Sequence, residues 1–163
     1  HMPSRRQRQM CIRDRGNEPY LIEFNVRMGD PECQVILPRL KTDLIKIINN
    51  VVNNKLKQTS INWHKKKSMT VVLCSKGYPG KYKKNKTIKN LDRIKLSKND
   101  FIYHAGTKLE NDQLKSNGGR VLNITSVGTD FLNIRKKIIK IIKNINWKGG
   151  FFRRDIGWKI INK

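Results

Sequence analysis

The stretch Tyr20–Arg27, YLIEFNVR, alternates between apolar and polar residues. Such alternation predicts a β-strand, because successive side chains of a strand point to opposite faces. The predicted apolar face carries four residues: Tyr20, Ile22, Phe24 and Val26. The opposite face is unusually polar, since it carries Glu23, Asn25 and Arg27. This strand is the starting point for the interpretation of the chain.

The GDPE sequence that follows predicts the start of a helix. Asp30 is suited to cap that helix, and Pro31 is suited to its first position. Apolar residues then recur at helical spacing between Val35 and Val52. We expect two helical segments there, broken near Pro38 and restarted at Thr42.

The polar stretch at 53–68 has no clear period and is the candidate boundary between two pieces of the chain. Strands are predicted at 69–75, 101–107 and 120–128, and a helix from Thr129 to Asn146. Six apolar residues form the core stripe of that helix: Phe131, Ile134, Ile138, Ile141, Ile142 and Ile145. The fold class is therefore α/β, of the α+β type, with residues 16–60 as one domain piece and 61–163 as a second domain.

Residues 4–15, SRRQRQMCIRDR, are rich in arginine and could be taken for a nucleic-acid-binding arm. However, Arg5–Asp14 back-translates without a gap into the transposase adaptor used in preparing sequencing libraries. We interpret residues 4–15 as translated adaptor and His1-Met2 as a cloning scar, and we exclude residues 1–15 from the fold prediction. The natural sequence is then expected to begin near Gly16, inside a longer gene.

The 163 residues carry a formal net charge of +24. Residues 4–15 contribute five Arg and one Asp, so about +20 belongs to the remainder. A charge of this size suggests a polyanionic partner, but most of it is lysine accompanied by Ile and Asn, and few aromatic residues lie among the lysines. We do not expect nucleic acid to be the primary partner. No apolar run is long enough to span a bilayer, so no membrane contact and a cytoplasmic location are expected.

Glu23, Asn25 and Arg27 lie two residues apart on one predicted strand face, so they can converge on one ligand. Carboxylate and amide oxygens suit Mg²⁺, and a guanidinium can bind a phosphate through two hydrogen bonds. The alternative is a solvent-facing strand that carries three polar residues, and spacing alone favours this alternative.

Five motifs that follow one another along the chain favour the ligand-binding interpretation instead: IEFNVRMGDPECQVILPRL, GYPG, HAGT, NGGRVL and RRDIGW. They resemble the last strand of the ATP-grasp domain and the carboxy-terminal domain of phosphoribosylamine–glycine ligases, also called glycinamide ribonucleotide synthetases. The likeness runs from about Pro19 to Trp158. It implies the end of an ATP-grasp domain followed by a small mixed domain that resembles the rudiment single hybrid motif of biotin carboxylases.

The resemblance implies ATP-dependent ligation of glycine to 5-phosphoribosylamine in purine biosynthesis. Glu23 and Asn25 match the family's Mg²⁺ or Mn²⁺ ligands, which bridge ATP phosphates. Arg27 would act in catalysis by steadying the transferred phosphoryl group. Asp30 would help to shape the amino-acid pocket, and Arg154 would lie near the ribose phosphate.

Alternatives stay open for the remaining polar motifs. His104 could be a general base, but a hydrogen-bonded structural histidine is the favoured interpretation. Gly118 and Gly119 could approach a phosphate, but a hairpin turn between strands already explains them and is the favoured interpretation. For Arg153, Arg154 and Asp155, an internal ion pair competes with the substrate-binding role.

The sequence supplies no amino-terminal domain, nucleotide-binding lysines or glycine-rich loop of an ATP-grasp enzyme. We therefore expect a fragment that needs the missing amino-terminal part of the same enzyme and is inactive alone. Two other hypotheses remain: a basic nucleic-acid-binding module, and a noncatalytic interaction domain derived from the ligase.

Overall fold

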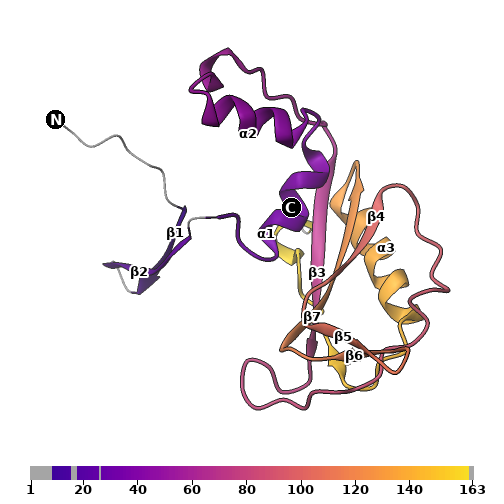
Figure 1. Cartoon of the computed structure of the whole chain (residues 1–163). Helices are drawn as coiled ribbons and strands as arrows, with labels where there is room; N and C mark the ends of the chain where they lie inside the picture. The colour runs from indigo at the N-terminus through magenta and orange to yellow at the C-terminus, as the bar shows by residue number, and fades with distance from the viewer. Residues whose placement is uncertain (1–8, 16–17, 26, 162–163) are drawn as a thin grey trace.

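The computed structural model describes residues 9–15, 18–25 and 27–161 (Figure 1). Its helices and strands follow in this order: β1 (Gln9–Arg15), β2 (Glu18–Asn25), α1 (Glu32–Ile36), η1 (Leu37–Arg39), α2 (Leu44–Val52), η2 (Leu56–Gln58), β3 (Lys67–Ser75), β4 (Asp100–His104), β5 (Thr107–Glu110), β6 (Gln113–Ser116), β7 (Arg120–Gly128), α3 (Phe131–Asn144), β8 (Gly150–Phe151) and α4 (Trp158–Ile161). Helices and antiparallel strands are mixed along the chain, which confirms the predicted α+β class.

The main sheet has four strands in the order β4-β7-β3-β8, and every pairing is antiparallel. Its central strand is β7, in which Ile124 is paired with Val71 of β3 on one side and with Ile102 of β4 on the other. Residues 121–127 are all buried. The sequence prediction for β7 at 120–128 is confirmed with its boundaries.

Helix α3 covers one face of this sheet (Figure 1). Asp130 caps it, because its carboxylate accepts a hydrogen bond of 2.9 Å from the backbone N–H of Asn133. Four isoleucines of the predicted stripe are buried against the sheet: Ile134, Ile138, Ile141 and Ile142. Phe131 and Ile145 complete the stripe at its two ends and are partly buried. The predicted helical spacing thus identifies the helix that forms the core.

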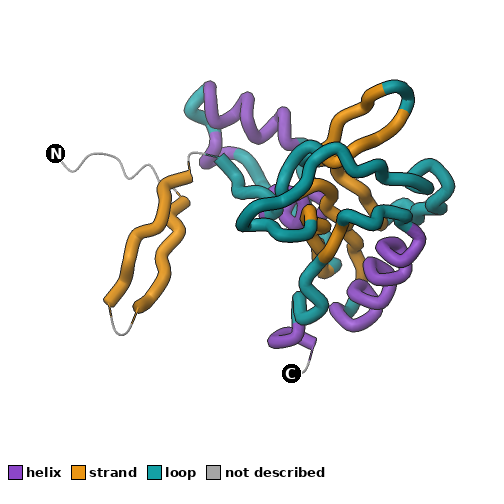
Figure 2. The backbone as a smooth tube through the Cα atoms, turned by 90° about the horizontal axis from the view of Figure 1, so that it is seen from below, coloured by secondary structure: helices purple, strands orange, loops and turns teal. Residues whose placement is uncertain are grey.

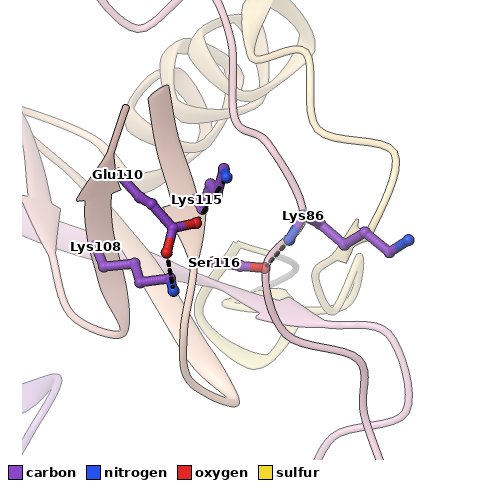
Figure 3. A network of polar contacts seen from close by, with 5 residues as sticks. All are labelled: Lys86, Lys108, Glu110, Lys115 and Ser116. Carbon is purple, nitrogen blue, oxygen red and sulfur yellow. Dashed lines mark hydrogen bonds and ion pairs between the residues drawn. The ribbon is translucent and has the colours of Figure 1, made fainter. Parts of the chain in front are cut away.

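A short hairpin, β5–β6, was not predicted from the sequence. Its turn is formed by Asn111 and Asp112, which both have positive φ, as a two-residue hairpin turn requires. On the hairpin surface, Glu110 lies between two lysines (Figure 3). Its two carboxylate oxygens are 2.9 Å from Lys108 Nζ and 2.7 Å from Lys115 Nζ.

The strand predicted at 20–27 is observed as β2, and it pairs with β1 as an antiparallel hairpin. This hairpin stands apart from the main sheet in both Figure 1 and Figure 2. No strand was predicted within residues 1–15, which were excluded from the fold prediction, so β1 was not expected. An isolated strand exposes unpaired backbone N–H and C=O groups, which any nearby extended segment can satisfy.

The segment after β2 departs from the predicted helix capping. Helix α1 begins at Glu32, Pro31 occupies its N-cap position, and no side chain caps it. Helix α2 begins at Leu44 with Asp43 as its cap, two residues later than the predicted restart at Thr42. Asp30 is turned instead toward the main sheet, as described below.

Helix α2 exposes a row of large apolar residues: Ile45, Ile48, Val51 and Val52. Because these side chains are exposed, no element in the described part of the chain covers the row.

Within the described ranges, no helix is both long and apolar enough to cross a bilayer.

Shortening a core isoleucine tests the packing of α3. Ile138 is 0% exposed and Ile45 is 66% exposed. Ile138→Ala should lower the free energy of unfolding by about 3 kcal/mol, because it removes buried methyl groups and leaves a cavity. Ile45→Ala should change it by less than about 0.5 kcal/mol. Denaturant unfolding measures both, and equal losses would contradict the assigned core.

The acid titration of Glu110 tests the hairpin. Hydrogen bonds from Lys115 and Lys108, together with their charges, lower the pKa of Glu110 to about 2. The stabilisation is then present above the ordinary glutamate pKa and is lost as the pH falls through about 2. An NMR titration of the Glu110 carboxyl carbon should show this low midpoint. Lys115→Gln should raise the midpoint toward the ordinary range, and an unchanged midpoint would refute the contact.

Candidate functional site

Strand β2 carries two of the predicted site residues, Glu23 and Asn25. In the β1–β2 register they are paired with Cys11 and Gln9. The pairing is irregular between Cys11 and Ile12, where the partner on β2 changes from Glu23 to Leu21. This irregularity lies before Glu23 on β2, so Glu23 and Asn25 themselves are regularly paired. Asn25 is 9% exposed, whereas the side chain of Glu23 lies outside the described part of the structure.

Arg27 was predicted on the same strand face, but β2 ends at Asn25, and Arg27 lies two positions beyond it in a bend and is exposed. Its Nη1 donates a hydrogen bond of 3.0 Å to the carbonyl of its neighbour Met28. A guanidinium has five N–H donors, so most of them remain available to a ligand. The loop then closes through Glu32, whose Oε2 accepts a hydrogen bond of 3.0 Å from the backbone N–H of Gly29.

Asp30 connects this loop to the main sheet. Its Oδ1 accepts hydrogen bonds of 2.9 Å from Gln34 Nε2 and 3.2 Å from Asn123 Nδ2. Its Oδ2 lies 3.4 Å from Arg120 Nη2, and its backbone carbonyl accepts a hydrogen bond of 2.7 Å from Arg120 Nη1. Arg120 and Asn123 both belong to β7, and they lie 90 and 93 positions further along the chain than Asp30. The segment after the predicted metal-binding strand is therefore attached to the centre of the sheet.

Two amide oxygens beside this connection have no hydrogen-bond partner among the described residues. They are Asn123 Oδ1 and Gln34 Oε1, and both atoms are buried. Asn123 itself is only 1% exposed. The carboxylate of Asp30 is already paired with Arg120, so the acceptors that remain at this place are the two amide oxygens. Such a set suits a donor such as an amine or ammonium group.

The GYPG, HAGT and NGGR motifs meet at the same end of β7. Gly106 and Gly118 approach so closely that a Cβ on Gly106 would lie 2.6 Å from Gly118 Cα. A Cβ on Gly119 would lie 2.1 Å from the ring of Tyr78. Ser75 Oγ donates a hydrogen bond of 2.8 Å to the carbonyl of Gly118. Glycine is therefore required here by close packing of the backbone.

The same contacts decide between the alternatives for Gly118 and Gly119. The sequence analysis allowed a hairpin turn at this position, but β6 pairs with β5, and β7 pairs with β3 and β4. The segment instead crosses between two sheets and is held by the carbonyl of Gly106, which accepts hydrogen bonds from Asn117 and Gly118. The hairpin interpretation is wrong, because tertiary packing determines this turn.

His104 lies at the end of β4 and is exposed. Its Nδ1 is 3.1 Å from Thr107 Oγ1, across the HAGT turn. His104 therefore makes a local hydrogen bond, as the favoured structural interpretation requires.

The RRDIGW motif forms the internal ion pair that was weighed against a substrate role. Arg153 donates two hydrogen bonds to Asp155, of 3.1 and 2.6 Å. The hydrogen bond from Arg153 lowers the pKa of Asp155. The carbonyl of Arg154 accepts a hydrogen bond from Arg135 of α3. The guanidinium of Arg154 is exposed and makes no ion pair with any residue in the described ranges.

Sequence reasoning did not assign roles to Arg120 and Asn123. Arg120 was quoted within a motif, and Asn123 is the only amide residue in the strand sequence RVLNITSVG. A polar residue at a buried strand position usually has a specific partner. That signal could have identified Asn123.

Comparisons with known proteins show the family of this chain. Residues 68–159 match the family described as phosphoribosylglycinamide synthetase, C domain. The chloroplastic phosphoribosylamine–glycine ligase of Arabidopsis thaliana is 42% identical over 156 residues, covering 94% of this chain and 29% of that protein. The trifunctional purine biosynthetic protein adenosine-3 of Gallus gallus is 42% identical over 144 residues, covering 88% of this chain and 14% of that protein.

A solved structure is also similar. The crystal structure of phosphoribosylamine–glycine ligase from Thermotoga maritima matches with a TM-score of 0.63 and 28% identity, covering 88% of this chain and 35% of that one. The chain belongs to the phosphoribosylglycinamide synthetase family, whose C domain it contains. Two of its relatives, from Arabidopsis thaliana and Mesorhizobium japonicum, are named phosphoribosylamine–glycine ligases. The chain spans 29% of the length of the first and 35% of the length of the second. The family resemblance drawn from the sequence motifs is confirmed.

Removing the Asp30 carboxylate tests the connection between the loop and the sheet. Asp30→Ala leaves buried Asn123 without its acceptor, so we expect the free energy of unfolding to fall by about 1–2 kcal/mol. Asp155→Ala removes a carboxylate from an exposed ion pair and is the matched control, which should leave the free energy of unfolding nearly unchanged. Denaturant unfolding of the 163-residue chain measures both. A loss in the control as large as that in Asp30→Ala would argue against the connection.

Proposed function

We propose that this chain supplies the carboxy-terminal part of a ligase that joins glycine to 5-phosphoribosylamine at the expense of ATP. The observation that carries the proposal is the bonding of Asp30, in the loop after Glu23 and Asn25, to Arg120 and Asn123 of β7. These hydrogen bonds attach the loop that follows the candidate metal-binding strand to β7, which begins within the NGGRVL motif. Similarity along 94% of the chain to a phosphoribosylamine–glycine ligase supports the same proposal.

The reaction has two steps. The glycine carboxylate attacks the γ-phosphorus of ATP, which gives glycyl phosphate and releases ADP. The amine of 5-phosphoribosylamine then attacks the acyl carbon, phosphate leaves, and the nitrogen loses a proton as the amide forms. Both steps place negative charge on phosphoryl oxygens, so the protein has to supply positive charge and well-placed donors.

Glu23 and Asn25 fit a Mg²⁺ or Mn²⁺ ion by the chemistry of their oxygens. The described ranges contain no cluster of three or more His, Cys, Asp or Glu that could hold a metal without substrate. A site of two protein oxygens, completed by ATP phosphates and water, is the usual form for Mg²⁺. Such an ion would neutralise charge on the transferring phosphoryl group.

Arg27 is the proposed catalytic residue, because its exposed guanidinium lies two positions beyond Asn25 and keeps free donors for a phosphoryl oxygen. Asp30 and the neighbouring amide oxygens would face the amino group of glycine or of phosphoribosylamine. Arg154 as a ribose-phosphate residue is supported only by its exposed guanidinium.

The proposed partner of this chain is the nucleotide-binding portion of the same enzyme. The exposed apolar row on α2 suits contact with that portion, since a patch of this kind is costly in water. The chain alone is expected to be inactive, because one strand cannot enclose ATP. The location is proposed to be cytoplasmic, although the Arabidopsis relative is named as chloroplastic.

The decisive experiment changes one carboxylate in a complete ligase that carries this chain. Glu23→Gln should lower Mg²⁺-dependent phosphate release, in the presence of ATP, glycine and phosphoribosylamine, by about a hundredfold or more. Glu18→Gln lies on the same strand, is exposed, and should retain nearly full activity. Unchanged turnover in Glu23→Gln, with an unchanged unfolding midpoint, would refute the assignment.

A further inference from the structure

A cationic pocket lies away from β2, between the 76–86 loop and the segment before β8. It has a volume of about 490 Å³ and is lined by five lysines and a tyrosine: Lys76, Lys81, Lys83, Lys86, Lys148 and Tyr82. The two segments are joined by a hydrogen bond of 2.8 Å from the backbone N–H of Lys76 to the carbonyl of Gly149. No aspartate or glutamate lines the pocket.

The ammonium groups of these five lysines have no protein partner within the described ranges. The ion pairs observed there use Lys108, Lys115 and two arginines instead. Figure 3 shows the contrast, since Lys108 and Lys115 converge on Glu110 while the side chain of Lys86 points away from it. Five like charges around one cavity repel one another, and an anion in the cavity would relieve that repulsion.

Two other pockets of similar volume differ in this respect. One, of about 520 Å³, is also basic but has Asp100 in its lining. The other, of about 450 Å³, is lined by Asp92 and Asp112 as well as by basic residues. The positive charge of both is therefore compensated in part by the protein itself.

A buried donor lies next to the five-lysine pocket. Trp147 is 8% exposed, and its indole Nε1–H has no acceptor among the described residues. A Cβ built on Gly149, which lines the pocket, would lie 3.2 Å from this nitrogen. A buried N–H without a partner is costly, so such groups usually bind water or a ligand. The same Cβ would lie 3.0 Å from Lys86 Cγ, so the stem of a pocket lysine lies beside the indole nitrogen, and a shift of that flexible side chain would open the nitrogen to the pocket.

We propose that this pocket binds a small anion that carries several phosphate groups. Flexible ammonium groups can each reach a different phosphate oxygen, and the indole N–H adds a directed neutral donor. The volume lies in the range of sites for small ligands. The site is separate from the Glu23–Asn25 strand, and its occupancy does not depend on the proposed ligase function.

The probe is inorganic tripolyphosphate, titrated into the 163-residue chain at about 0.1 M salt, where distant charges are screened. The readout is the ¹⁵N–¹H spectrum, in which three tryptophans give indole signals, and Trp147→Phe assigns the relevant one. The Trp147 signal should shift in a saturable way, with a dissociation constant of about 0.1 mM. Single inorganic phosphate should bind at least about tenfold more weakly.

Two triple variants provide the control, since each removes three positive charges. Lys81→Gln/Lys83→Gln/Lys148→Gln changes the pocket, and affinity should fall about tenfold or more. Lys136→Gln/Lys140→Gln/Lys143→Gln changes another lysine-lined surface, on α3, and affinity should stay within about twofold. All six lysines line surface pockets, so both variants should keep the unfolding midpoint of the unmodified chain.

Three results would overturn the proposal. One is the absence of saturation up to about 10 mM, which would indicate only general ion screening. Another is an equal loss of affinity in the two triple variants, which would indicate attraction to the overall charge. The third is tighter binding of a mixed-sequence single-stranded oligonucleotide with equal losses in both variants, which would indicate a diffuse nucleic-acid surface.

Discussion

The central strand β7 is the element on which the rest of the structure depends. Its backbone pairs with β3 on one edge and β4 on the other, and its apolar side chains meet the isoleucines of α3. The same strand supplies Arg120 and Asn123 to Asp30. Because one rigid strand both forms the core and holds the loop after β2, the stability of the core and the position of that loop are coupled.

The sequence predicted the elements whose signals are local and strong. The α3 stripe has an unbroken helical period, and β7 is a long strand of β-branched residues bounded by glycines, so both were predicted nearly to the residue. The β5–β6 hairpin was missed because each strand has four residues, TKLE and QLKS, with mixed polarity and a turn of Asn111-Asp112. Short strands of that kind are defined by pairing rather than by composition.

Asp30 shows why the site was only partly predictable. An aspartate before a proline fits a helix cap on local grounds, and that role was predicted. The structure uses the carboxylate for long-range bonds to β7, and α1 begins without a side-chain cap. Tertiary contacts of more than ninety residues' separation have no local sequence pattern, although the buried Asn123 was a visible clue. The roles of Glu23, Asn25 and Arg27 came from family resemblance, since their spacing alone favoured a solvated strand.

The β1–β2 hairpin has a consequence for how this strand meets other molecules. Its pairing runs from Gln9↔Asn25 to Arg15↔Glu18 and tolerates one irregularity at Cys11/Ile12. Ladder pairing of this type is made by main-chain groups, so it places few demands on the identity of the partner strand. The edge of β2 is therefore suited to β-augmentation, in which an extended peptide supplied from another chain exchanges with β1. An expression tag or a vector-derived extension next to such an edge becomes a competitor for the native neighbour of the strand.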